Sequence, residues 1–267
     1  MKKSIAFPLT MIILLLMAVQ SFIGLFFPCV YNDSAVVIAS YQGNDLITLF
    51  VAVPILALTL IFARRGSRRA AYIWVSMLCY AFYNYLFYMF GAVLNDLFLV
   101  YIAAFTLSVI ALIVAIRDFG FNDVSNDFTP SGLFKFISAF LMIFGLIIGG
   151  MWLAQWINFL VTGEPPVIPG MTEGYKLVAT VDFSTQVPAL IIASVLLWKN
   201  KPSGFILGSI LTIANTVYLL VLLAFCPFAS RAGVQEAWGG FPLFGSLFVA
   251  SLVSSVILLN KLKPHRL

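Results

Sequence analysis

Eight long apolar runs follow one another along this sequence, and they constrain the fold more than any other feature. Each run is long enough to cross the hydrocarbon core of a bilayer as a helix, at about 1.5 Å of rise per residue. The sequence therefore predicts an all-α fold, a polytopic membrane bundle of eight transmembrane helices in a single integral membrane domain over residues 1–267. The runs are Ile5–Phe27, Leu46–Ala63, Ala70–Phe90, Leu97–Ile116, Phe134–Val161, Leu177–Trp198, Ser203–Cys226 and Gly240–Asn260.

The composition agrees with a membrane location. Hydrophobic residues make up 62% of the chain and charged residues 9%, with a mean hydropathy of +1.06. Such a chain has too little polar surface to cover a water-soluble globule. The net charge of +5 does not indicate nucleic-acid binding, because the basic residues lie at the ends of apolar runs and not on one polar face. We expect a lipid bilayer around this chain, and no nucleic acid as a partner.

The residues that usually hold metals and haem are scarce. The one histidine, His265, lies in the polar C-terminal tail, and Cys29, Cys79 and Cys226 form no CxxC pair. Neither a zinc site nor haem ligation inside the bundle is indicated, so we expect no cofactor. Cys29 and Cys226 both fall at helix ends on one side of the predicted bundle. Whether they form a disulfide bond or stay free is left open, because bridging needs a Cα separation that sequence does not show.

The turn Arg64–Arg69 places four arginines between two apolar runs and orients the predicted bundle. A guanidinium at the bilayer centre costs about 2.5 to 3.5 kcal/mol on insertion scales, and short basic loops stay in the cytoplasm. With this turn and both termini cytoplasmic, thirteen of the fifteen lysines and arginines fall in inner segments, and only Lys176 and Arg231 fall outside. The sequence thus predicts cytoplasmic N and C termini.

The predicted outer loops are acidic. They are Pro28–Asp45, Gly91–Asp96, Thr162–Lys176 and Pro227–Gly239.

The longest inner loop, Arg117–Lys135, carries Asp123, Ser125 and Asp127 at the spacing of a calcium loop. Phe128 stands where such a loop needs glycine, and no glutamate completes it. We expect a solvated loop and not an ion site.

The two halves of the chain, residues 1–117 and 134–267, share a weak pattern. Each contains a helix with Val-Pro, Val53-Pro54 or Val187-Pro188, and then a helix with an asparagine in an apolar setting, Asn84 or Asn215. Since four crossings preserve orientation, a duplication would relate the halves by an axis along the membrane normal. The alternative is coincidence, because proline is common in membrane helices.

The third predicted helix carries a dense aromatic segment over residues 80–90. Tyr80, Asn84 and Tyr88 are four residues apart and share one helix face. An aromatic belt at the membrane interface would account for Tyr88 but poorly for Asn84, because a buried amide needs a protein partner or cavity water. Structural packing and a binding site therefore both stay open for this face.

The sixth predicted helix contains the carboxylate that lies most clearly inside an apolar run, Asp182. Gln186 lies four residues on and shares its face, and Pro188 frees a backbone carbonyl at the same level. An ionisable residue at membrane depth indicates a functional site by default. The alternative is a hydrated aspartate at the start of the helix.

Further polar residues extend this candidate site. Asn215 and Tyr218 on the seventh predicted helix, and Gln155 and Asn158 on the fifth, fall at middle to outer depth. The sequence predicts an outward-facing polar pocket that binds a small molecule or cation, as in a carrier or receptor. Its proposed ligand-binding residues are Asp182, Gln186, Asn84, Asn215, Tyr88 and Tyr218.

Small residues suggest a second function. Gly145 and Gly149, Gly204 and Gly208, and Ser246, Ala250 and Ser254 form stripes suited to close helix contact. The chain would then be a non-catalytic membrane subunit that docks a partner protein or a second copy. An enzyme acting on lipid-linked substrates is the least favoured, because no acid–base pair is evident and no catalytic residue is predicted.

Several short segments resemble a group of uncharacterised bacterial multi-pass membrane proteins. They are Gly43-Asn44-Asp45-Leu46, Val53-Pro54, Arg64-Arg65-Gly66-Ser67, and Tyr83-Asn84-Tyr85 with Phe90-Gly91-Ala92. The resemblance covers mainly the first half. It implies a location in the bacterial inner membrane and no particular activity.

Overall fold

A computed structural model describes residues 4–118, 128, 131–164, 166 and 174–263. Among these residues the structure is helical, and the one bridge of extended backbone pairs Phe128 with Leu262. The helices are α1 (Ala6–Phe26), α2 (Ala35–Ile47), α3 (Val53–Arg64), α4 (Arg68–Gly91), α5 (Phe98–Asp118), α6 (Leu133–Thr162), α7 (Gly174–Val181), α8 (Val187–Trp198), α9 (Pro202–Arg231) and α10 (Phe241–Asn260). The prediction of an all-α polytopic bundle is confirmed.

Eight helical spans of the described chain are long and apolar enough to cross a membrane, as predicted. Six are single helices. The other two are composite, since α2 continues into α3 as Ala35–Arg64, and α7 continues into α8 as Lys176–Trp198.

Both composite spans widen into a π-helical turn at the same relative position. The turns are Thr48–Ala52 and Asp182–Gln186, and each directly precedes a Val-Pro pair. Proline has no N–H to donate and its ring crowds the preceding turn, so the helix must locally depart from regular hydrogen bonding. π-turns of this kind often occur at functional sites.

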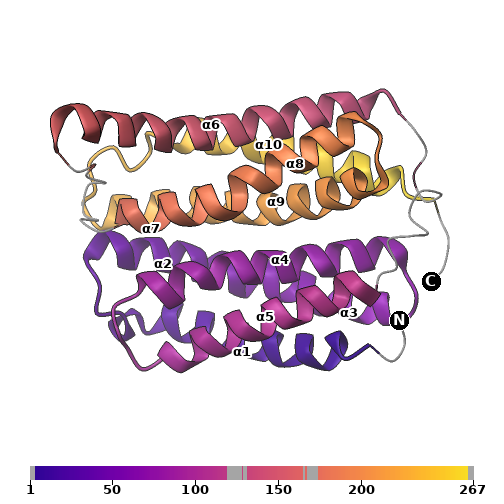
Figure 1. The fold of residues 1–267 in the computed structure, drawn as a ribbon. Coiled ribbons are helices and arrows are strands. Elements are labelled where there is room, and N and C mark those ends of the chain that lie inside the picture. Colours follow the sequence, from indigo (N-terminus) through magenta and orange to yellow (C-terminus); the bar gives the residue numbers. More distant parts are fainter. Residues whose placement is uncertain (1–3, 119–127, 129–130, 165, 167–173, 264–267) are drawn as a thin grey trace.

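The two halves form two groups of helices that meet along α4 and α9 (Figure 1). In each of these two helices 67% of the apolar window is buried, against 28% in α5 and 22% in α10. α1 and α5 lie on one side of the central pair, and α6 and α10 on the other (Figure 1). The contacts between the halves run mainly between α2 and α9 and between α4 and α9. That the halves arose by duplication stays a hypothesis, which the matching π-turns support.

Apart from Asp45 and Asp182, the charged residues of the described chain lie mainly toward the two ends of the bundle. α1 begins and α10 ends at one end of the bundle (Figure 1), where Arg64–Arg69, Lys199 and Lys261 also lie at helix ends. We call this the basic end. The opposite end, which carries Asp33, Asp96, Glu164 and Glu236, is the acidic end.

Two predicted loops are shorter than expected, because helices continue into them. The second span begins at Ala35 and not at Leu46, so Asp45 lies inside a helix, and its exposed fraction is 0%. Placing Asp45 in an outer loop was therefore wrong. α9 likewise extends through Pro227 to Arg231, five residues beyond the predicted end at Cys226.

The predicted inner loop is described only in part. Asp123, Ser125 and Asp127 lie outside the described residues. Phe128 is buried, stacks on Phe205 of α9 with ring centroids 4.7 Å apart, and meets Tyr72 of α4 edge-on. The residue that argued against a calcium loop thus anchors this segment to the two central helices.

The glycine stripes serve contacts within the bundle. A Cβ on Gly145 would lie 3.3 Å from Leu190 of α8, and one on Gly149 would lie 3.3 Å from Val187. A Cβ on Gly204 would overlap the backbone at Leu196 and Leu197. These glycines let α6 and α9 approach α8 closely, so they leave no free face for a partner protein at these positions.

The three cysteines are free thiols. Cys29 is exposed, Cys226 is buried on α9, and Cys79 is half-buried on α4. The open question of a bond between Cys29 and Cys226 is answered for this structure, because no disulfide joins them.

Candidate functional site

Asp182 lies in the π-turn between α7 and α8, with 7% of its surface exposed. Eight helical residues precede it, so it is not a hydrated residue at a helix start, which was the alternative interpretation. Two donors hold its carboxyl group. The Tyr83 hydroxyl of α4 donates to Oδ1, and the indole Nε1 of Trp152 on α6 donates to Oδ2 over 2.7 Å.

These two donors come from different parts of the fold. Tyr83 belongs to the first half of the chain and Trp152 to the second, and Asp182 joins them. Neither was predicted as a site residue. Tyr83 stood out only as one of many aromatics in its helix, and Trp152 lies in an apolar run with no sequence signal that links it to Asp182.

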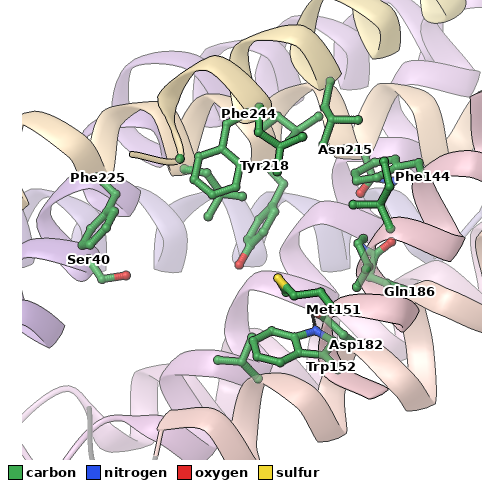
Figure 2. A pocket seen from close by; sticks show the side chains of 18 of the residues that line it. Ser40, Phe144, Met151, Trp152, Asp182, Gln186, Asn215, Tyr218, Phe225 and Phe244 are labelled. Atoms are coloured by element: carbon green, nitrogen blue, oxygen red, sulfur yellow. Dashed lines mark hydrogen bonds between the residues drawn. The ribbon is translucent and has the colours of Figure 1, made fainter. Parts of the chain in front are cut away.

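A cavity of about 510 Å³ opens beside Asp182. It lies between α6, α9, α10 and the composite span α7–α8, and reaches α2 at Ser40 (Figure 2). Its walls are mainly apolar and aromatic, with Phe144 and Met151 from α6, Phe225 from α9 and Phe244 from α10. The volume is in the range of small-molecule sites, which are about 300 to 1,000 Å³.

Three further predicted site residues line the cavity with Asp182. They are Gln186 from the same π-turn, and Asn215 and Tyr218 from α9 (Figure 2). The Tyr218 ring packs edge-on against Tyr83, with centroids 4.8 Å apart. Four of the six predicted residues therefore meet at one cavity.

Two polar atoms in this group have no hydrogen-bond partner. They are Oε1 of Gln186 and Nδ2 of Asn215, on side chains whose exposed fractions are 8% and 4%. Buried polar atoms in proteins are nearly always satisfied, and an unsatisfied one costs about 1 to 3 kcal/mol. An acceptor and a donor therefore stand free beside the cavity, as expected where a ligand binds.

The charge around the cavity is one-sided. None of the described residues that line it is Lys, Arg or His, whereas Asp182 and Glu236 both carry carboxyl groups. Glu236 lies in the exposed segment between α9 and α10, at the acidic end. The site is therefore suited to a positively charged group and poorly suited to an anion.

Asn84 and Tyr88 do not line this cavity, which corrects their predicted grouping with Asp182. Both are fully buried in the first half, with exposed fractions of 0% and 1%. Asn84 Oδ1 accepts a hydrogen bond from Nδ2 of Asn44. Tyr88 donates to Oδ1 of Asp45 over 2.8 Å and so is not part of an interfacial belt. Gln155 and Asn158 do not line the cavity either.

Asp45 is the centre of a second polar group, which we call the Asp45 cluster: Gln20, Tyr31, Asp45, Tyr85 and Tyr88. Gln20 Nε2 donates to Oδ1 of Asp45 over 2.8 Å, and Tyr31 donates to Oδ2 over 2.6 Å. Tyr85 in turn donates to Oε1 of Gln20 over 3.0 Å. Burial, followed by the charge of Asp45, raises the pKa of Tyr31 above its ordinary value, so its hydroxyl is a donor at neutral pH.

The Asp45 cluster is packed closely. Tyr31, Tyr41 and Tyr88 stack around it, with centroids of Tyr41 and Tyr88 4.7 Å apart. A Cβ on Gly24 of α1 would overlap both the Asp45 carboxyl group and the Tyr31 hydroxyl. The two halves thus differ in their use of a buried carboxyl group, since one is enclosed by donors and the other borders a cavity.

In comparisons with known proteins, no family model, no curated protein and no solved structure matches this chain.

Proposed function

We propose that this protein is a membrane carrier or receptor for a small organic cation with an apolar body, which binds in the cavity at Asp182. The observation that carries the proposal is the cavity itself, because apolar and aromatic walls converge on a buried carboxyl group and none of the described residues that form them is basic. The architecture fits either role. The proline-broken span that carries Asp182 favours a carrier, because irregular helix at membrane depth is typical of transporter binding sites.

The carboxyl group and the aromatic rings would both contact the cationic group of the ligand. A carboxylate has about four lone-pair directions, and Tyr83 and Trp152 use two of them. The aromatic faces of Tyr218, Phe144 and Phe244 add cation–π attraction of about 0.5 to 2 kcal/mol each where a cation lies over a ring.

The free acceptor and donor indicate which further groups the ligand carries. Oε1 of Gln186 would accept from an N–H or O–H of the ligand, and Nδ2 of Asn215 would donate to an oxygen or nitrogen. We therefore expect an amine with one additional hydrogen-bonding group, and a preference for primary or secondary amines over quaternary ones.

We further propose that the protein resides in a bacterial inner membrane with its basic end in the cytoplasm. The grouping of Arg64–Arg69, Lys199 and Lys261 at one end supports this orientation through the positive-inside rule. The cavity would then lie toward the periplasm.

The experiment measures binding of alkyl amines and alkyltrimethylammonium ions to the purified protein by thermal shift. A ligand at a hundred times its Kd stabilises the native state by about 2.7 kcal/mol. Asp182→Asn should weaken binding by about 10- to 100-fold, the effect of one hydrogen bond to a charged group. The matched control is Asp96→Asn, an exposed carboxylate at the same end of the bundle that does not line the cavity. Equal stabilisation of wild type and Asp182→Asn, or none in wild type, would contradict the proposal.

A further inference from the structure

The cavity has an incomplete wall between α6 and α10. In the first half, the corresponding helices α1 and α5 pack against each other extensively, whereas α6 and α10 touch at only a few positions. The second half is therefore open where the first half is closed.

Three residues on the two sides of this gap line the cavity and also face the outside of the bundle. They are Ile147 and Met151 of α6 and Leu243 of α10, with exposed fractions of 37%, 44% and 44%. We call these three residues the lateral opening. Because α6 and α10 hardly touch each other, the exposure of these side chains indicates that the cavity reaches the lipid-facing side between them. Exposed Glu236 also lines the cavity and marks a second opening at the acidic end.

The depth of the lateral opening decides what lies outside it. Ile147 is the fifteenth of the 30 residues of α6, which places it about 22 Å from either end of that helix. The hydrocarbon core extends about 15 Å to each side of the bilayer centre. Ile147 therefore faces hydrocarbon and not water, whereas Leu243, the third residue of α10, lies at the side of the lateral opening nearest the acidic end.

We infer that the cavity receives its ligand sideways from the bilayer, through the lateral opening, and that the ligand is an amphiphilic amine dissolved in the membrane. This inference rests on the proposed function, which assigns the ligand a cationic group. It adds that the ligand is amphiphilic and that it enters from the bilayer. The apolar body would reach the cavity through hydrocarbon, and the amine would end at Asp182 with Gln186 and Asn215 close by.

Kinetics distinguish entry from the bilayer and entry from water. The probes are primary ω-bromoalkylammonium ions of increasing chain length, whose bromine quenches tryptophan fluorescence on contact. Trp152 lines the cavity and reports arrival. Trp156, Trp198 and Trp238, which are about half exposed, are replaced by phenylalanine, and buried Trp74 remains as a constant background.

The protein in lipid nanodiscs is mixed with each probe in a stopped-flow instrument. For entry through the bilayer, the association rate per aqueous probe concentration should rise about fourfold for each added methylene, because membrane partitioning rises by that factor. Rates independent of chain length would overturn the lateral route.

Variants of the lateral opening provide a second test of the entry route. Leu243→Phe narrows the lateral opening and should slow association and dissociation together, by about tenfold. Leu243→Ala should speed both rates. The control is Val249→Phe, also on the exposed face of α10 but outside the cavity lining, which should change neither rate.

The outcomes separate the two proposals. If quenching is lost in Asp182→Asn, but the association rate depends neither on chain length nor on the residue at position 243, the binding site is supported and the lateral route is overturned. Absence of quenching with every probe overturns both.

Discussion

Replacing Asp45 tests whether its cluster stabilises the first half of the bundle. Asp45→Leu keeps a side chain of similar size but removes the acceptor of three hydrogen bonds, from Gln20, Tyr31 and Tyr88. All three donors lie on buried side chains, with exposed fractions of 0%, 4% and 1%. Each lost bond costs about 1 kcal/mol net, and each donor left unsatisfied adds to that cost. We expect a loss of about 3 to 5 kcal/mol in the free energy of unfolding.

Asp45→Asn is the matched variant. Its remaining oxygen can still accept from Gln20 and Tyr88, while the new amide nitrogen meets Tyr31, whose hydroxyl can rotate to accept. We expect this variant to lose only about 1 to 2 kcal/mol. Gly24→Ala should also destabilise, since its Cβ would overlap the same carboxyl group.

The assay is reversible unfolding in mixed micelles of fixed composition, followed by circular dichroism. Asp96→Leu serves as the control because Asp96 is exposed, and it should stay within about 0.5 kcal/mol of wild type. If Asp45→Leu unfolded within about 1 kcal/mol of wild type, the three hydrogen bonds would not contribute as argued, and the cluster would not stabilise the fold.

Two further predictions concern helix contact and orientation. Gly43→Ala should destabilise by about 1 to 3 kcal/mol in the same unfolding assay, because its Cβ would lie 2.8 Å from the backbone nitrogen of Phe225 on α9. Gly245→Ala, with nothing within 4 Å, should be neutral, and equal effects of the two would refute the close α2–α9 contact. A membrane-impermeant maleimide should label exposed Cys29 in intact cells, and Ser67→Cys only after permeabilisation, whereas the reverse pattern would invert the proposed topology.

The number of spans and the separation of charge followed from the sequence, because they depend on single-residue free energies of transfer. A long apolar run must be helical in lipid, where each backbone polar group needs an internal partner. A cluster such as Arg64–Arg69 must remain outside the hydrocarbon. Neither conclusion requires knowing which helices are neighbours.

Part of the candidate site also followed from the sequence. Asp182 and Gln186 lie on one helix face by spacing alone, and both line the cavity. Asp45 was missed because its polar neighbours Asn44 and Gln42 appeared to end the apolar run. The apolar residues Ala35–Ile38 before them were the signal that the helix begins earlier.

The tertiary structure alone decided which helices face one another. Helical spacing placed Asn84 and Tyr88 on one face, but only packing shows that this face meets α2 and Asp45, while Tyr83, three residues from Tyr80, turns to Asp182. The cavity between α6 and α10 is likewise a property of two helices that pack loosely, although both are apolar spans like their counterparts in the first half. The physical reason is that hydropathy measures the exchange of a side chain between water and lipid. Close contact between helices depends instead on the shapes and hydrogen-bonding groups that two faces present to each other.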